Sequence, residues 1–314
     1  MKLSVMMITY NHERFIAQAI ESVLAQRVTF DYEIVIGEDC STDATRAIIM
    51  DFHHRFPGRI VPLLRNQNIG AMRNFEATLL TCRGQYLALL EGDDYWTSRE
   101  KLVRQVNFLD THPGSSMCCH RVQVLDETGL AKTDVFPSRR AGPYTIEDLL
   151  KGNFVMTCSA VLRRDLVPVL PPWFRKMKLG DWPMFALAAR HGTIELMDEV
   201  MAVYRVHAGG SWSTLPAITH LRETSRMLEA LDKQLDFQYT RTIRRTLAHW
   251  YFDMARHSRH DGNWTETGKH LVNFIRNGGW QVIGWKAAKR ASLLYNRCSR
   301  WTRNAISRQP SVNA

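Results

Sequence analysis

Apolar runs and amphipathic stretches alternate along the first part of the chain. Four continuous apolar runs predict buried strands, at Leu3–Thr9, Tyr32–Gly37, Ile60–Leu64 and Tyr86–Leu90. Between them, periodic apolar positions and capping residues predict helices, at Arg14–Gln26, from Ser41, Thr42 or Asp43 to Phe52, and from about Ala71 to Cys82. Strands without polar alternation, separated by helices, are typical of a parallel sheet covered on both faces. The sequence therefore predicts an α/β fold.

The pattern becomes less regular after residue 94. A helix is predicted at Lys101–Thr111, followed by strand candidates at Met117–Val124, Val155–Leu162, Ile194–Met197 and Met201–Val206. Gly180 and Asp181 precede a further helical stretch at Pro183–Arg190. From Leu215 onward only helices are predicted, so we expect an α/β domain at 1–212 and a helical C-terminal region at 213–314.

Polar side chains follow the carboxyl end of each predicted N-terminal strand, where parallel sheets bind ligands. They are Thr9, Tyr10 and Asn11; Glu38 and Asp39; Asn66 and Asn68; and Asp93 and Asp94. Adjacent carboxylates repel unless a cation neutralises them, and a divalent ion commonly bridges carboxylates to phosphates. Gly-Asp-Asp is also good turn chemistry, so a solvated turn is the alternative.

Composition and motifs exclude several classes. The six cysteines form no CxxC pair, which argues against a disulfide framework or a cysteine metal site. No dinucleotide or P-loop glycine motif occurs. The first residues do not read as a signal peptide and no apolar run approaches the ~20 residues that span a bilayer, so we expect a cytoplasmic protein.

The net charge of +10 is concentrated at the C-terminus. Nine of the 41 Lys and Arg residues follow Glu266, and no Asp or Glu does. This argues against general nucleic-acid binding and favours a localised anionic partner. Apolar residues at helical spacing from Trp280 predict a basic amphipathic helix at 280–306, which would lie on an anionic membrane surface. Packing against the rest of the protein or a second subunit is the alternative.

Six stretches carry a family resemblance: SVMMITYNHERFIAQAIESVLAQ, YEIVIGEDCSTDAT, NQNIGAMRN, GQYLALLEGDDYW, GDWPMF and YRVHAGGS. Over roughly residues 1–212 the chain resembles the family-2 glycosyltransferases, inverting enzymes that use nucleotide-sugar donors. The resemblance implies a GT-A fold, which is Rossmann-like with a mainly parallel sheet flanked by helices, here with an α-helical C-terminal extension.

The resemblance also implies roles for individual residues. The residues implied for donor binding are Thr9, Tyr10, Asn11, Asp39, Arg73 and Asp93. Asp93 and Asp94 match a DXD-type motif, with Asp94 and His207 on Mn²⁺ or Mg²⁺, and Asp181 matches the catalytic base. Glu38 replaces the more usual Asp. Read without the family, Asp181 would be a helix N-cap and His207 a turn or core residue.

The implied function is transfer of a sugar from a nucleoside-diphosphate donor, UDP above all, to a hydroxyl of a saccharide or lipid-linked acceptor. Such enzymes build surface polysaccharides, here from the inner face of the membrane. A sugar nucleotidyltransferase is the alternative enzyme, although the segment Ile8–Asn11 lacks the Gly-rich, basic loop that such an enzyme would need. A non-catalytic glycosyltransferase-like binding module is the other alternative.

Overall fold

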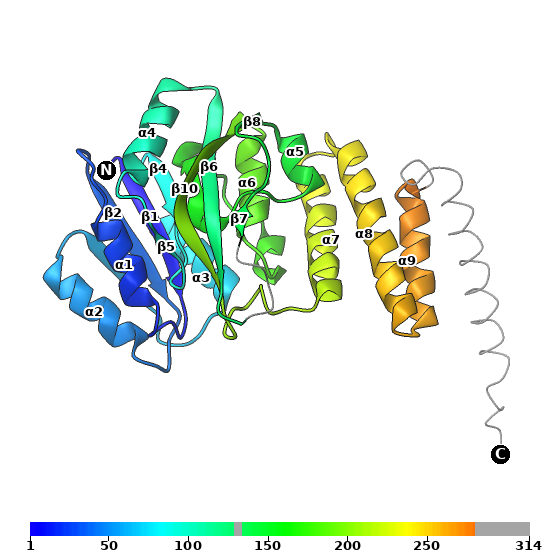
Figure 1. Cartoon of the computed structure of the whole chain (residues 1–314), viewed down its shortest axis with the longest axis horizontal. Coiled ribbons are helices and arrows are strands. Elements are labelled where there is room, and N and C mark those ends of the chain that lie inside the picture. Colours follow the sequence, from blue (N-terminus) through cyan, green and yellow to red (C-terminus); the bar gives the residue numbers. More distant parts are fainter. Residues whose placement is uncertain (129–133, 280–314) are drawn as a thin grey trace, which may run out of the picture. The chain divides into compact units, whose positions relative to one another are not determined.

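The strands form one mixed sheet with helices on both faces, in a computed structural model that describes residues 1–128 and 134–279 (Figure 1). The chain divides into two compact units, Met1–Thr214 and a second that starts at Leu215. The first unit holds the ten described strands, and the described part of the second is helical.

The sheet combines a parallel N-terminal part with a mixed remainder. Its strands are β1 (Leu3–Thr9), β2 (Tyr32–Glu38), β3 (Ile60–Leu64), β4 (Tyr86–Leu89), β5 (Tyr95–Trp96), β6 (Ser115–Asp126), β7 (Val135–Phe136), β8 (Gly142–Tyr144), β9 (Val161–Arg163) and β10 (Thr193–Val206). Along the sheet the order is β3-β2-β1-β4-β9-β6-β10-β5, with β7 on β6 and β8 on β10. The first four are parallel, β9 is antiparallel to β4 and β6, and β6 and β10 are again parallel.

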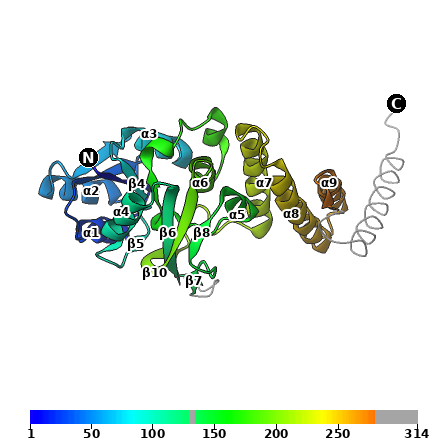
Figure 2. The same ribbon diagram turned by 90° about the horizontal axis from the view of Figure 1, so that it is seen from above.

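Helices cover both faces because the strand order reverses after β3. The helices of this unit are α1 (Ile16–Leu24), α2 (Thr45–Arg55), α3 (Ala71–Thr81), α4 (Lys101–Thr111), α5 (Ile146–Lys151) and α6 (Asp181–Ala189). Right-handed crossovers place α1 and α2 on one face and α3 on the other. Figure 2 shows α1 and α3 on opposite sides of the sheet. The strands between them are buried on both faces, which explains their continuous apolar sequences.

The register brings the strand ends to one level. Thr9 of β1 pairs with Glu38 of β2, which pairs with Leu64 of β3. The loops after β1 and β2 therefore start side by side at the same edge, and the backbone N–H of Asp39 donates to the carbonyl of Thr9. The predicted gathering of polar residues follows directly from this register.

Two strand predictions in the second half of the sheet were wrong. Val155–Leu162 is not one strand, because a 3-10 turn at Thr157–Ser159 interrupts it and only β9 is paired. The two short strands predicted between residues 194 and 206 are one strand, β10, with register shifts near Val200. The polar residues at this irregularity gave the appearance of a loop.

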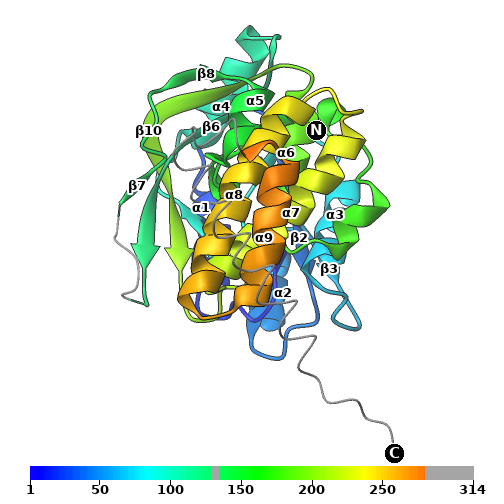
Figure 3. The same cartoon turned by 90° about the vertical axis from the view of Figure 1, so that its right-hand side faces the viewer.

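The second unit contains three described helices, α7 (Ala217–Gln234), α8 (Thr240–His260) and α9 (Trp264–Arg276). Figure 3 shows α8 and α9 side by side, and Asn263 caps α9 by accepting from the N–H of Glu266. No described helix in either unit is long and apolar enough to cross a membrane. The predicted amphipathic helix at 280–306 lies outside the described residues.

Candidate active site

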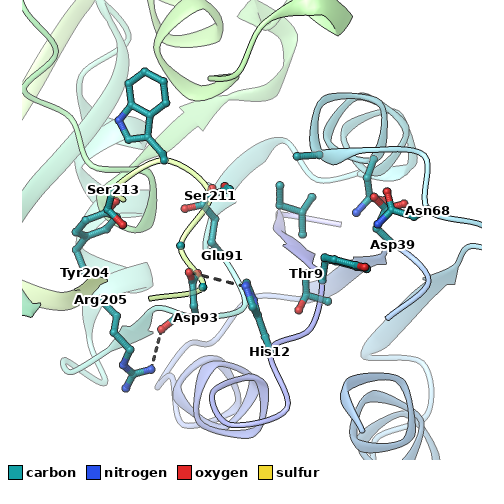
Figure 4. Close-up of a pocket in the computed structure, with 17 residues that line it drawn as sticks. Thr9, His12, Asp39, Asn68, Glu91, Asp93, Tyr204, Arg205, Ser211 and Ser213 are labelled. Atoms are coloured by element: carbon teal, nitrogen blue, oxygen red, sulfur yellow. Dashed lines mark hydrogen bonds and ion pairs between the residues drawn. The ribbon is translucent and has the colours of Figure 1, made fainter. Parts of the chain in front are cut away.

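A cleft of about 360 Å³ opens at the carboxyl edge of the parallel strands. Its walls come from the ends of β1 and β2, the segment after β4, the start of α3 and the segment that follows β10. Figure 4 shows Asp93 and Glu91 on one side, Asp39 and Asn68 on the other, and Thr9 between them. The hydroxyl of Thr9 is buried without a hydrogen-bond partner.

Asp93 lies between two histidines. Nε2 of His207 is 3.0 Å from its Oδ2, and Nε2 of His12 is 3.9 Å from the same atom. The backbone N–H of Gly209 donates to Nδ1 of His207, so in the neutral ring Nε2 carries the proton and donates to Asp93. The ring of His207 also packs on Phe15, with centroids 4.7 Å apart. These contacts fix the orientation of both partners.

Arg205 of β10 holds the two adjacent carboxylates in place. Its guanidinium donates to the backbone carbonyl of Asp93 at 2.7 Å and to the side chain of Gln18 at 2.8 Å. Its backbone N–H donates to Oδ1 of Asp94 at 2.8 Å. Oδ2 of Asp94 is buried without a hydrogen-bond partner. The site therefore depends on a strand more than a hundred residues away in sequence.

The acidic groups have divergent pKa values. Burial raises the pKa of Glu91 well above its usual range, and the neighbouring carboxylates, led by Asp93, raise it further. Burial and then the charge of Asp93 do the same to the pKa of Asp94. Burial alone would raise the pKa of Asp93, but the hydrogen bond from His207 and the charges of the two histidines lower it overall. Burial lowers the pKa of His12, which favours its neutral form.

Asp39 organises the opposite wall. Its Oδ1 accepts from the N–H of Ile69 at 2.8 Å and its Oδ2 from the N–H of Gly70 at 2.9 Å. Gly70 has a φ of 85°, a conformation that favours glycine, and immediately precedes α3. Each carboxylate oxygen keeps a second lone pair, so Asp39 can still accept a hydrogen bond from a ligand.

Glu38 and Asn11 support the neighbouring loops. The buried side chain of Glu38 accepts from the N–H of Ser41 and from Arg46. Oδ1 of Asn11 accepts from the N–H of Thr42 at 2.8 Å, and the backbone N–H of Asn11 donates to the hydroxyl of Ser41. These bonds join the loop after β1 to the loop after β2. The replacement of Asp by Glu at position 38 therefore affects a loop anchor, and Glu38 is not among the residues that line the cleft.

Asp181 is the first residue of α6, and its Oδ2 accepts from the hydroxyl of Thr157 at 3.1 Å. Burial raises its pKa, while hydrogen bonds from the backbone and from Thr157 oppose the increase. It lies close enough for its charge to raise the pKa of Glu91. Gly180 lies against Phe174 and Met72, where a Cβ atom would be 2.8 Å from the Phe174 ring.

The predicted site residues fall into two groups. Four line the cleft: Thr9, Tyr10, Asp39 and Asp93. Five lie outside its described lining: Asn11, Arg73, Asp94, His207 and Asp181. Among these, His207 hydrogen-bonds to Asp93 and Asp94 accepts from the N–H of Arg205, whereas Arg73 is exposed on α3.

Three residues of the site were missed by sequence reasoning: His12, Glu91 and Arg205. Glu91 could have been predicted from the sequence, because it stands two positions before Asp93 at the same strand end. His12 could also have been predicted, because it lies three residues beyond the end of β1, at the edge of the sheet where ligands were expected. Arg205 lies within β10, and nothing in the local sequence indicates that this strand passes beside Asp94.

Two overlapping groups of side chains have donor atoms close enough to hold a divalent ion. They are His12, Asp93 and His207, and Glu91, Asp93 and Asp94, with the atoms of each group within 4.8 Å of one another. The buried, unpartnered Oδ2 of Asp94 is an acceptor that a cation would satisfy. The residues therefore fit a divalent ion. The two predicted ligands, Asp94 and His207, belong to different groups that share Asp93.

Comparison with known proteins gives a family and several relatives. Residues 4–169 match the family model described as "Glycosyl transferase family 2". An uncharacterized protein of Mycobacterium tuberculosis is 41% identical over 216 residues, which are 67% of this chain and 60% of that protein. The chain thus matches less than two thirds of that relative's length. An uncharacterized glycosyltransferase of Nostoc is 31% identical over 71% of this chain and 70% of its own.

A further relative and two solved structures add detail. The putative teichuronic acid biosynthesis glycosyltransferase TuaG of Bacillus subtilis is 29% identical over 65% of this chain and 79% of its own. The structure of S. aureus TarS with UDP-GlcNAc has a TM-score of 0.66 at 17% identity, covering 97% of this chain and 92% of that one. A Pyrobaculum calidifontis mannosyltransferase with GDP-Man and Mn²⁺ has a TM-score of 0.54 at 14% identity, covering 96% and 83%. Both structures share the fold.

Gly92 should not tolerate a side chain, because at this residue the acidic segment packs closely against the end of β1. A Cβ atom there would lie 2.6 Å from the Thr9 hydroxyl oxygen and 2.9 Å from Nδ1 of His12. We expect Gly92→Ala to lower the free energy of unfolding by about 1–3 kcal/mol, the usual cost of overpacking, measured by urea denaturation. Gly114→Ala is the matched control, since a Cβ atom there meets nothing within 4 Å. Equal stability of the two variants would contradict this packing.

Proposed function

The chain belongs to glycosyltransferase family 2 and has the GT-A fold, and from this premise we propose that it is a metal-dependent inverting glycosyltransferase. The donor is a nucleoside-diphosphate sugar, with UDP as the proposed nucleotide. The acceptor is a hydroxyl of a saccharide or a lipid-linked saccharide. The unit Met1–Thr214 carries the catalysis, and the helical region that follows assists acceptor or membrane binding.

The observation that carries this proposal is that several carboxylates cluster around one cleft and that their surroundings differ. Asp39 stands on one wall with lone pairs available for a base N–H. Asp93 stands on the other wall with the buried Asp94 directly behind it in the chain, and Arg205 holds the carbonyl of Asp93 at 2.7 Å and Oδ1 of Asp94 at 2.8 Å. Thr9 and Tyr10 lie between the walls, and the half-exposed ring of Tyr10 offers a surface on which a base can stack.

Asp94 and His207 are the proposed metal ligands. Asp93, which belongs to both groups of possible ligands, is proposed to contact the ribose or the sugar and is also close enough to contact the ion. A bound divalent ion would stabilise the negative charge that gathers on the nucleoside diphosphate as the glycosidic bond breaks. Arg205 keeps the acidic segment in position by holding the carbonyl of Asp93. Arg73, exposed on α3, is proposed to approach the base or the diphosphate from the Asp39 side.

Asp181 is the proposed general base. Inversion requires a base on the face of the sugar opposite the leaving group, where it takes the proton of the acceptor hydroxyl. The N-terminus of α6 favours a negative charge on Asp181, and Thr157 orients one of its oxygens. Its raised pKa makes it a better proton acceptor than an exposed aspartate.

The relatives support a role in the synthesis of cell-surface polysaccharides. TuaG is named for teichuronic acid biosynthesis, and TarS of Staphylococcus aureus is a poly(ribitol-phosphate) N-acetylglucosaminyltransferase. The TarS structure holds UDP-GlcNAc, which favours a UDP-sugar, and the mannosyltransferase structure holds Mn²⁺. None of these relatives supports a sugar nucleotidyltransferase. A binding module without activity is distinguished from the transferase by measuring donor binding and UDP release with the wild-type protein.

Replacing the base should separate binding from transfer. We expect Asp181→Asn to bind the donor as wild type does, but to turn over UDP-sugars at least ~10²-fold more slowly, because the amide cannot take a proton. Binding is measured by calorimetry and turnover by UDP release. Asp165→Asn, at an exposed turn, is the control.

The wild-type enzyme should also lose activity as pH falls through the raised pKa of Asp181, since only the ionised carboxylate acts as a base. Near-normal transfer by Asp181→Asn would remove this residue from the mechanism. If the wild-type protein binds donors but turns over none of the UDP- and GDP-sugars tested, the chain is a binding module.

The location we propose is the cytoplasmic face of the cell membrane, through the basic segment at 280–306. Each basic residue near an anionic surface contributes on the order of 1 kcal/mol, so binding should be strong at low salt and weak at high salt. We expect the full chain to sediment with phosphatidylglycerol vesicles and not with phosphatidylcholine vesicles. Deletion of residues 278–314 should abolish sedimentation and leave donor binding intact. Failure of the full chain to sediment at low salt would contradict membrane binding.

A further inference from the structure

We infer that His12 is a metal ligand of the proposed transferase, and that His12, Asp93 and His207 together select a first-row transition-metal ion such as Mn²⁺ over Mg²⁺. The inference rests on the proposed function and adds to it a ligand and a metal preference.

The three side chains converge from distant parts of the chain. His12 follows β1, Asp93 follows β4, and His207 follows β10. Their donor atoms lie within 4.8 Å of one another, and Oδ2 of Asp93 is the shared centre, 3.0 Å from Nε2 of His207 and 3.9 Å from Nε2 of His12. Figure 4 shows the His12 ring directed at Asp93. One ion could contact all three after small adjustments of side chains and a change of the His207 tautomer, which moves the ring proton from Nε2 to Nδ1 and breaks the hydrogen bond from the N–H of Gly209.

His12 is held firmly by its own backbone. Its N–H donates to the hydroxyl of Thr45 at 2.8 Å, and its carbonyl accepts from the N–H groups of Phe15 and Ile16 at the start of α1. The ring lies edge-on to His207, with centroids 6.1 Å apart, and Gly92 approaches its other side. A ligand anchored at a helix start and between packed neighbours is well preorganised for a metal.

No other described contact satisfies the ring. Nδ1 of His12 is buried and has no hydrogen-bond partner, and Nε2 lies 3.9 Å from Oδ2 of Asp93, too far for a hydrogen bond. A buried imidazole whose nitrogens make no hydrogen bond contributes little to the stability of the fold.

The donor types decide which ion fits best. Mg²⁺ prefers oxygen ligands in a near-ideal octahedron, whereas imidazole nitrogens suit first-row transition ions. The competing group, Glu91, Asp93 and Asp94, offers only oxygens, which suit Mg²⁺, Ca²⁺ and Mn²⁺ alike and so give no preference for Mn²⁺ over Mg²⁺. Each group has two members in the lining of the cleft, His12 and Asp93 in one and Glu91 and Asp93 in the other. Asp94 keeps its unpartnered Oδ2 for the ion, as proposed above, so the nitrogens of His12 and His207 are what distinguish the first group.

The direct test is pulsed electron paramagnetic resonance of Mn²⁺ bound to the full chain in the presence of UDP. The wild-type protein should show ¹⁴N couplings from imidazole. His12→Gln should weaken these couplings and lower Mn²⁺ affinity at least ~10-fold, because even the loss of a residue that only supports a ligand costs 10–100-fold. Mg²⁺ affinity, measured by competition, should change little.

Two variants provide the comparison. His53→Gln removes a histidine of α2 that hydrogen-bonds to the carbonyl of Ile60, away from the cleft, and should bind Mn²⁺ as wild type does. Glu91→Gln tests the all-oxygen group. The inference is overturned if wild-type Mn²⁺ shows no ¹⁴N coupling, or if Glu91→Gln loses Mn²⁺ while His12→Gln keeps it. The first of these outcomes needs no variant to fold.

UDP release from UDP-sugars on the same samples separates this inference from the proposed function. Turnover without ¹⁴N coupling would reject His12 as a ligand and leave the transferase in place. Coupling without turnover of any nucleotide sugar would reject the transferase and keep the metal site.

Discussion

Repulsion between carboxylates at one buried sheet edge is the constraint on which this site depends. Glu91, Asp93 and Asp94 lie within a few ångströms of one another with little water to screen them, so burial and mutual charge raise the pKa of two of the three. Only Asp93, flanked by two histidines, is driven toward its ionised form. A divalent cation held by these residues would relieve this repulsion and would offer the nucleoside diphosphate of the proposed donor a positive charge to bind.

The architecture around the carboxylates follows from the same constraint. Gly92 allows the acidic segment to approach β1 closely, and the loops after β1 and β2 are joined through Asn11. Arg205 fixes the segment from the far side, with its guanidinium over Phe15 and Tyr95. Arg205 uses the carbonyl of Asp93 and Oδ1 of Asp94, so Oδ2 of Asp94 is left for a ligand.

The N-terminal half of the fold was predictable because its signals are local. Continuous apolar runs are typical of β1 to β4, and the register of a parallel sheet then requires Thr9 and Asp39 to be neighbours. β10 was harder, because exposed residues at its irregularity resemble a loop, and the Val155–Leu162 prediction failed at a short 3-10 turn. Arg205 could not be predicted, since its partner Asp94 is 111 residues away. The roles proposed for Asp39, Asp93 and Asp181 come from the family resemblance, and the structure adds their neighbours.

The most direct measurement is calorimetry of UDP binding to the full chain with Mn²⁺, with EDTA, and with the Asp93→Asn variant. The account predicts binding that requires the divalent ion and is strongly weakened in the variant, because the ion and the acidic segment together hold the diphosphate. Binding of equal strength in EDTA, or no UDP binding in the presence of Mn²⁺, would contradict the claim that this carboxylate edge is a metal-assisted UDP-sugar site.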